Sequence, residues 1–438
     1  MRSKALYIFV LFALLVGWRP LEAQQLRLSH LYSPVDLSFD LNQLYNYNSY
    51  EHNRWGAGLV LTVPIEHRSD SVRRLSELNS FRAQAYAAWG TRDHAWKYGA
   101  RLGLNFPRQV FRTVFAAFDN DLERVGARNF QSYNIFLIAS NSSYRSSHFS
   151  AVQRVYVGLE IDPNGPLVID AQARLSRERL LFDADGLLFP CIDKADTLPW
   201  LHFLEFELLL KWDSHLMLSI LAGAPMPTDA DTYDLAPYAR LLAQYSNTFL
   251  LKEGRLGKVR LYAQAGSTLN DHTRLARRFD LSGTGGSRFL FDNTLTTVAP
   301  NTFMADAFGQ LTVRYESPRP LWDLTFSAPR PFLQATALWG ALMSTNGAAE
   351  QYYDLLSGRP LTSAQVSNAE AAMALPLCAP NQGLLEPVVG LNNILQQQYL
   401  AVGLAVAGQL SPKNSFYHQG NFWDHLCVMF TVTVEIEE

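Results

Sequence analysis

Residues 430–437, near the end of the chain, alternate strictly between apolar and polar side chains. The apolar positions are Phe430, Val432, Val434 and Ile436, and the polar positions are Thr431, Thr433, Glu435 and Glu437. Successive side chains of a β-strand point to opposite faces, so this segment would have one apolar face and one charged face. Such a strand is expected to lie between an apolar environment on one face and an aqueous environment on the other.

The same alternation recurs along most of the chain. Apolar residues occupy every second position in residues 35–41, 55–63 and 96–106, and lysine and arginine lie between them in the last segment. Strand-length segments with this period, and with charges on the second face, are typical of membrane-spanning β-barrels. The pattern therefore predicts an all-β fold, a transmembrane antiparallel β-barrel of about 16 strands, within a range of roughly 14–18.

Candidate strands are bounded by the alternation and by turn residues. They are residues 35–43, 54–64, 80–90, 95–106, 110–119, 129–140, 152–163, 166–177, 199–212, 214–223, 236–247, 256–267, 303–316, 331–343, 384–391, 397–410 and 424–437. Short turns are expected at 90–93 and 162–165. The long connections, expected to be loops that face outward, are 65–79, 178–198, 268–302 and 344–383. Residues 363–374 could form a short helix in the last of these loops.

The N-terminus has the features of a secretory signal. Arg2 and Lys4 precede the apolar run 5–18, and a small-residue cleavage site follows. The run is too short for the roughly 20 apolar residues of a spanning helix. We expect a signal peptide at 1–23, which leaves 24–438 as one barrel that is exported to the cell outer membrane.

The composition agrees with a barrel in lipid. Charged residues make up 18% of the chain, whereas a soluble domain has about 25%, and aromatic residues make up 12%. Outer-membrane barrels carry an apolar outer band with aromatic girdles, so outer-membrane lipids and lipopolysaccharide are expected partners. The formal net charge of −3 gives no reason to expect nucleic acid as a partner.

A block in the first third of the chain is more specific than the alternation. It consists of Trp89, Gly90, Thr91, Arg92 and Asp93, then Trp96, Lys97, Tyr98 and Gly99, then Asp121, Glu123 and Gly126. This block resembles a run in an uncharacterised β-barrel family of Bacteroidota outer membranes. Further pieces that are similar, in the same order, are Asn48, Glu51, Arg54 and Gly56, then Phe303 and Met304, then Glu386, Gly390, Asn392, Asn393 and Ile394.

The resemblance implies an outer-membrane barrel in which the block has a structural role. Proteins of that family usually carry an N-terminal carboxypeptidase-regulatory-like domain. Only a short stretch of mature chain precedes the first expected strand here, so we expect that domain to be missing. The family has no settled activity. The resemblance therefore implies an outer-membrane location and a barrel fold, but it does not imply a molecular activity.

Strand parity places charges of both signs in the lumen. The acidic positions are Asp36, Asp40, Glu160, Asp170, Glu205, Glu207, Glu316, Glu435 and Glu437, and the basic positions are Arg82, Lys97, Arg101, Arg174, Arg260 and Arg314. Selective pores usually carry rings of one sign. Buried charges of both signs persist when they are paired, so we favour a lumen held together by ion pairs over a selective pore lining.

Several loop residues invite a chemical interpretation. Two Asp-rich turns could bind calcium. The first contains Asp183, Asp185 and Gly186, and the second contains Asp229, Asp231 and Asp234. Neither has the full series of calcium ligands with a closing glutamate. A lipid hydrolase could use Ser287, His272 and Asp292, although no Gly-x-Ser-x-Gly motif is present. A basic cluster, Arg274, Arg277 and Arg278, is interpreted as a solvated loop face, with lipopolysaccharide phosphates as a possible contact.

Three cysteines leave at least one thiol unpaired in an exported protein. Cys191 and Cys378 lie in expected loops and could pair, whereas Cys427 begins the last strand. No Cys/His spacing predicts a metal site, and no cofactor is expected.

These features favour a non-enzymatic barrel that acts as an accessory or structural component of an outer-membrane assembly or secretion complex. The alternatives are a passive channel or porin for small solutes and, less favoured, an outer-membrane lipid hydrolase.

Overall fold

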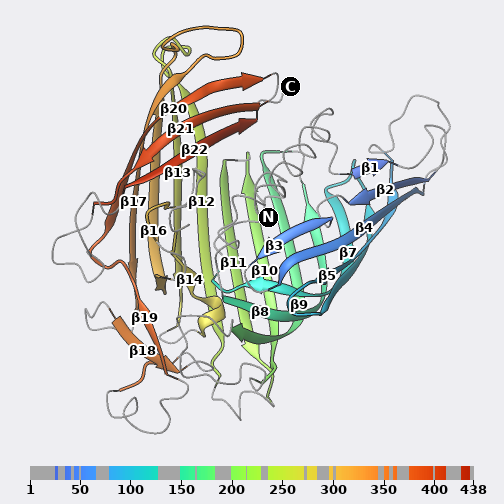
Figure 1. Ribbon diagram of the computed structural model, residues 1–438. Helices are drawn as coiled ribbons and strands as arrows, with labels where there is room; N and C mark the ends of the chain where they lie inside the picture. Colours follow the sequence, from blue (N-terminus) through green and yellow to red (C-terminus); the bar gives the residue numbers. More distant parts are fainter. Residues whose placement is uncertain are drawn as a thin grey trace.

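The computed structural model describes residues 25–27, 35–40, 44–48, 51–65, 78–126, 148–162, 165–182, 199–213, 215–227, 235–270, 274–283, 295–298, 302–343, 350–354, 359–362, 374–397, 400–410 and 426–434. Figure 1 shows their strands forming one large sheet that curves around a central lumen. No helix within these ranges has the length and apolar character needed to cross a bilayer.

The strands of the large sheet follow the chain, and each pairs with its neighbours in antiparallel register. They are β1 (Gln25–Arg27), β2 (Asp36–Asp40), β3 (Tyr45–Asn48), β4 (His52–Pro64), β5 (Ser80–Gly90), β6 (Trp96–Asn105), β7 (Phe111–Arg124), β8 (His148–Ile161), β9 (Leu167–Phe182), β10 (Leu201–Trp212), β11 (Leu216–Pro225), β12 (Tyr238–Leu250), β13 (Lys258–Thr268), β16 (Ala307–Glu316), β17 (Arg330–Ala341), β20 (Leu384–Gln397), β21 (Leu400–Ala407) and β22 (Cys427–Val434). Two small pairs lie outside this sheet: β14 (Phe279–Asp280) with β15 (Met304–Ala305), and β18 (Glu350–Asp354) with β19 (Ala374–Cys378).

The large sheet has the expected number of strands. Strands β2 and β3 pair with successive parts of β4 and form one interrupted strand, while β1 is a short addition that pairs with β2. The sheet then has 16 strand positions, which confirms the predicted number. The strand expected at 129–140 lies outside the described residues. Because β7 pairs directly with β8, that segment adds no strand to the sheet between them.

Burial alternates along the strands as the sequence pattern predicts. Val155 and Val157 of β8 are 56% and 55% exposed, whereas Glu205 of β10 is only 1% exposed. On β2, Ser38 and Asp40 are buried while Leu37 and Phe39 are half-buried. An apolar outer face and a polar inner face are the arrangement of a transmembrane β-barrel. The fold class predicted from the sequence is confirmed.

The two ends of the barrel differ. The short connections 162–166, 213–215 and 251–257 lie at one end, which we call the short-turn end, and there β2 begins and β22 ends. Connections 183–200, 269–306 and 342–383 leave from the opposite, loop-rich end. Of the long connections expected to face outward together, 65–79 leaves instead from the short-turn end, because β4 runs opposite to β3.

The sheet does not close on itself within the described residues. Its pairings run from β1 to β22, and no described pairing joins β22 to β1 or β2. Figure 1 shows these two edges apart, with β20, β21 and β22 on one side of the opening and β1 and β2 on the other. Strands β1 and β22 are therefore the two edges of the described sheet.

Candidate functional site: a loop anchored in the lumen

We call the connection between β13 and β16, residues 269–306, the lumen loop, and its described parts, 274–283, 295–298 and 302–306, pack inside the barrel. Every residue of 274–283 is buried. This part contains the 3₁₀ turn η7 (Leu275–Arg277) and strand β14, which pairs with β15 at the end of the loop. Figure 1 shows η7 and β14 in yellow and gold inside the curve of the sheet. Buried backbone and charged groups must find partners, and the lumen wall supplies them.

Glu205 of β10 is the centre of the anchor. Arg277 of the lumen loop donates to its carboxylate from Nη2 at 2.7 Å, and Arg174 of β9 donates from Nε at 2.7 Å. The hydroxyls of Ser176, at 2.8 Å, and of Tyr238 also donate to Glu205. The Glu205 side chain is fully buried. One carboxylate therefore joins the loop to three strands of the wall, β9, β10 and β12.

A second carboxylate, that of Glu178, also binds arginines of the lumen loop. Glu178 of β9 lies 2.6 Å from Nη1 of Arg274 and 3.0 Å from Nη2 of Arg277. The guanidinium carbon of Arg274 is 3.3 Å from the centroid of the Phe203 ring, a cation–π contact. Both loop arginines are thus held by paired, desolvated interactions.

Arg277 stays charged in this site. Burial by itself would lower its pKa, but the carboxylates of Glu178 and Glu205 raise the pKa well above the usual arginine value. The anchor is therefore a permanent ion pair between loop and wall.

Arg278 makes a separate contact within the loops. It is fully buried, and its Nε lies 3.2 Å from Asp306, near the end of the lumen loop. Its guanidinium carbon is 3.8 Å from the ring centroid of Tyr353 on β18, so the lumen loop also touches the connection 342–383. Burial raises the pKa of Asp306, while the charge of Arg278 opposes that shift.

Apolar packing completes the anchor. Phe279, Leu281 and Phe303 of the lumen loop are buried in one cluster with Phe308 of β16 and Leu338 of β17. The rings of Phe279 and Phe308 lie 4.9 Å apart. The loop therefore contacts both the β9–β10 wall and the β16–β17 wall.

The far part of the loop is tied to β20. The backbone N–H groups of Thr296 and Thr297 donate to Glu386 at 2.9 Å and 2.8 Å, and both threonine hydroxyls donate to the same carboxylate. Glu386 is fully buried. Since Arg277 is bound at β9 and β10 and Thr296 at β20, the described loop residues bridge the lumen.

Gly126, after β7, lets the loop backbone approach closely. Its carbonyl accepts a hydrogen bond from the N–H of Asp280 at 2.9 Å. Its φ of 72° is in the left-handed region, and an added Cβ would lie 2.7 Å from the Asp280 nitrogen and 2.9 Å from the Arg278 oxygen. A side chain here would strain the backbone and displace the loop.

Gly126→Val is therefore expected to free the lumen loop and to cost about 1–3 kcal/mol through backbone strain alone. Limited trypsin digestion with mass spectrometry should reveal new cuts after Arg277 and Arg278, which are buried in the native barrel. Gly165→Val is the control, because an added Cβ there meets no atom within 4 Å. Equal protection of the loop in both variants would contradict the docking of the loop on Gly126.

The motif block forms a buried network at the same end of the barrel. Lys97 lies 2.7 Å from Glu51 and also pairs with Asp93. Arg54 binds both oxygens of Asp121, at 2.5 Å and 2.8 Å, and the Tyr86 hydroxyl donates to Asp121 at 2.7 Å. Arg54 also lies 3.9 Å from Glu51, so residues that are distant in the sequence, from the turn before β4 to β7, meet in one set of ion pairs.

The other motif residues on β5, on β6 and in the turn between these strands lie next to this network. The N–H groups of Thr91 and Arg92 donate to the carbonyls of Asn53 and Glu51, so the turn after β5 is held against the start of β4. Trp96 is 59% exposed on the outer face, and its ring lies 5.1 Å from that of Trp89. The remaining block residues, Gly90, Tyr98 and Gly99, lie in the same β5–β6 hairpin.

Glu123 links the motif to the lumen loop. Arg154 of β8 donates to Glu123 at 3.3 Å and to Asp119 at 3.1 Å. Arg277 approaches the same Glu123 carboxylate at 3.9 Å. Together with Gly126, this places the end of the motif block directly against the anchored segment.

The sequence interpretation of the basic cluster was wrong. Arg274, Arg277 and Arg278 are 6%, 4% and 0% exposed, so they form neither a solvated face nor an accessible site for lipopolysaccharide phosphates. The loop that contains them folds inward because carboxylates of the wall attract it. Acidic residues on otherwise apolar strands, such as Glu205 within Leu201–Trp212, could have indicated this in advance.

The lumen-facing charges lie as follows. Asp40, Lys97, Glu205 and Arg314 are buried, while Asp36, Arg82 and Glu207 are partly buried. Arg101 is exposed, with its guanidinium carbon 3.7 Å from the Phe115 ring centroid. Additional pairs join Lys211 to Asp170 and Lys258 to Glu316. Opposite charges meet along the inner wall, as the mixed signs indicated.

Other candidate residues lie outside the described residues. They are Asp183, Asp185, Gly186, Cys191, Asp229, Asp231, Asp234, His272, Ser287, Asp292, Glu435 and Glu437, together with residues 1–23 and 363–373. Cys378 and Cys427 are both half-buried in the described part. The described part also contains no group of acidic, histidine or cysteine side chains that could hold a metal ion.

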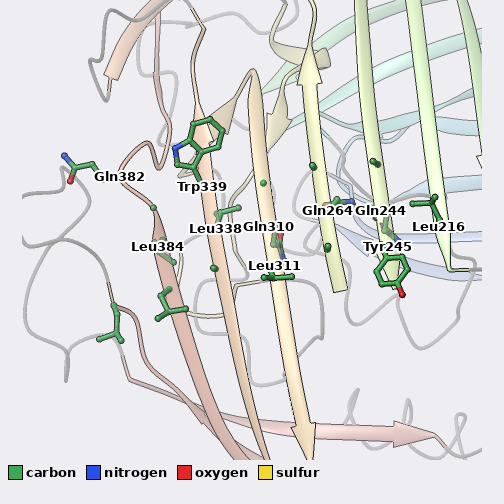
Figure 2. Close-up of a pocket in the computed structure, with 18 residues that line it drawn as sticks. Leu216, Gln244, Tyr245, Gln264, Gln310, Leu311, Leu338, Trp339, Gln382 and Leu384 are labelled. Carbon is green, nitrogen blue, oxygen red and sulfur yellow. Dashed lines mark hydrogen bonds between the residues drawn. The ribbon is translucent and has the colours of Figure 1, made fainter. Parts of the chain in front are cut away.

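The outer wall carries an apolar groove of about 900 Å³ over β12, β13, β16, β17 and β20. Figure 2 shows Tyr245 and Trp339 on either side of it. Small residues, among them Ala265 and Gly309, line its floor. The exposed Leu311 and Trp339 place the groove on the lipid-facing side, where hydrocarbon chains would fill it.

Comparisons with protein-family models and with curated proteins gave no match. Similar solved structures include CdiB from Escherichia coli, with 12% identity and a TM-score of 0.42, covering 93% of this chain and 63% of that chain. BamA from Haemophilus ducreyi lacking POTRA domains 1–3 has 8% identity and a TM-score of 0.46, covering 89% and 71%. CdiB from Acinetobacter baumannii has 9% identity and a TM-score of 0.40, covering 89% and 58%. This chain spans less than two thirds of either CdiB chain, and similarities with TM-scores this low carry no argument about function.

Proposed function

We propose that this protein is a non-enzymatic outer-membrane β-barrel that acts as an accessory or structural component of an assembly or secretion complex. It would reach the outer membrane through a cleaved signal peptide. The observation that carries the proposal is the opening between β22 and β1. Edge strands recruit other strands readily, so these edges favour pairing with a strand of a partner protein.

The anchored loop supports this function over a passive channel. Its described residues cross the lumen from Glu205 to Glu386, and both anchoring carboxylates are fully buried. A porin needs an open aqueous path, whereas this barrel places apolar and ion-paired side chains in that path.

Membership in the Bacteroidota barrel family is part of the same proposal. It is supported by the convergence of the motif residues Glu51, Lys97, Asp93, Arg54 and Asp121 in one buried network. Residues that keep a fixed spacing in a family often do so because they meet in space. The partners in this role are other outer-membrane or periplasmic proteins, with lipids and lipopolysaccharide around the barrel.

A photo-crosslinking amino acid at Val428 tests the proposal. Val428 lies on the edge strand β22 and is 64% exposed, and Val157 on the doubly paired β8 is a matched control with 55% exposure. In native membranes of the source bacterium, the Val428 position should give a discrete adduct with another protein, and purification in mild detergent should recover the same partner. A solitary barrel without adducts, or equal adducts at both positions, would contradict an edge-specific partner.

A further inference from the structure

The connection between β16 and β17 carries a second exposed apolar surface, away from the lumen loop. Residues 317–329 continue the β16–β17 hairpin beyond the strands at the short-turn end, and we call them the apolar hairpin. Their exposed apolar side chains are Leu321, Trp322, Leu324 and Phe326, which are 58%, 47%, 52% and 62% exposed, and the exposed polar residues Asp323 and Thr325 alternate with them at the tip. Contiguous exposed apolar patches mark interaction sites with membranes or proteins.

The apolar hairpin is an ordered projection. Backbone hydrogen bonds join Ser317 to Pro331 at 2.9 Å and Leu321 to Pro329 at 2.8 Å. At the tip, Leu324 and Ser327 bind each other's backbone at 2.8 Å and 3.0 Å. These contacts present the apolar side chains without the need to order a flexible segment.

The patch is continuous with the lipid-facing wall. Leu311, Val313 and Tyr315 point outward along β16 and lead directly into the hairpin. The Tyr315 hydroxyl donates to the carbonyl of Leu256 at 3.0 Å, which joins β16, just before the hairpin, to the neighbouring turn 251–257. In that turn Leu256 is also exposed. The bilayer at this wall is therefore the apolar phase nearest to the tip.

The polar groups of the hairpin suit a membrane interface. The Trp322 indole N–H donates to the Ser327 hydroxyl at 3.0 Å, so the ring can enter an apolar region without losing its hydrogen bond. Trp side chains favour the headgroup level of a bilayer. The exposed cations Arg319, Lys252 and Arg255 lie on the two turns, where lipid phosphates would neutralise them.

We propose that the apolar hairpin inserts into the bilayer leaflet at the short-turn end and fixes the barrel wall at β16 and β17 to that leaflet. The occupant of this surface is the lipid of the membrane that the barrel already spans. A protein partner is the competing occupant. This role does not depend on the open edge or on the function proposed above.

Depth-dependent fluorescence quenching tests the insertion. In a variant with Cys191, Cys378 and Cys427 changed to serine, Leu324→Cys is labelled with an environment-sensitive dye. The full barrel is then reconstituted in phosphatidylethanolamine and phosphatidylglycerol vesicles. The control is Glu253→Cys, on the charged tip of the neighbouring turn, and gel mobility before and after heating shows that both variants are folded.

We expect the label at position 324 to be quenched at least twofold more than the label at 253 by lipids that carry a nitroxide near the headgroup, and to be protected from aqueous iodide. Equal quenching by lipid at the two positions, with equal access to iodide, would overturn the proposal. A photo-crosslinker at position 324 that joins a protein in native membranes, without lipid quenching in vesicles, would likewise overturn it in favour of protein docking.

Discussion

Replacing Glu205 by alanine is expected to destabilise the folded barrel by about 3–5 kcal/mol, because it leaves buried guanidinium groups without their counter-charge. Glu205 accepts hydrogen bonds from Arg174, Arg277, Ser176 and Tyr238, and its side chain is fully buried. This destabilisation should lower the denaturant concentration at the midpoint of unfolding. The fraction of folded protein is measured from the gel band that resists heating in detergent.

Glu207→Ala is the matched control for this prediction. Glu207 lies two residues further along β10, binds the same Arg174 at 3.0 Å and is 30% exposed at its side chain. Partly exposed ion pairs contribute about 0–1 kcal/mol, so this change should have a small effect. Similar losses in the two variants would show that Glu205 is not the centre of the anchor.

An arginine on the outer face of β8 should be the next most damaging change. Val155 lies near the middle of β8 and is 56% exposed, so Val155→Arg would place a charge in hydrocarbon at a cost of roughly 2–4 kcal/mol. The expected result is a lower unfolding midpoint in lipid vesicles, or failure to insert.

Gln172→Arg on β9 is the lumen-facing counterpart. Gln172 is the direct cross-strand partner of Glu207, so an arginine there gains an opposite charge. It should therefore be tolerated. Greater damage from Gln172→Arg than from Val155→Arg would reverse the assignment of inner and outer faces.

The fold could be predicted from the sequence because the side chains of a barrel strand face lipid and lumen in turn, and this makes apolar and polar residues alternate. Trp96 and Leu102 are exposed and Lys97 is buried, as the alternation of 96–106 requires. The strand count was predictable for the same reason. The expected strand at 129–140 had the apolar content of a strand, but local pattern alone does not show that β7 pairs directly with β8.

The candidate site was not predictable in the same way. Arg274, Arg277 and Arg278 stand in a polar loop whose local sequence looks solvated. Their partners Glu178 and Glu205 lie on strands distant in the sequence. Only long-range pairing distinguishes a solvated arginine from an anchoring one, and a single sequence carries no record of that pairing. The motif block gave a second hint beside the acidic residues on apolar strands, because its final residues, Glu123 and Gly126, contact the loop.

Planar-bilayer recording tests most directly whether the lumen is held closed by its own loop. The native barrel is compared with a variant in which residues 274–298 are replaced by a short Gly-Ser linker, and gel mobility before and after heating confirms that both are folded. We expect the native barrel to show no persistent open steps and the variant to show reproducible steps of porin size. Steady steps of porin size from the native barrel would contradict an anchored loop and would favour a passive channel.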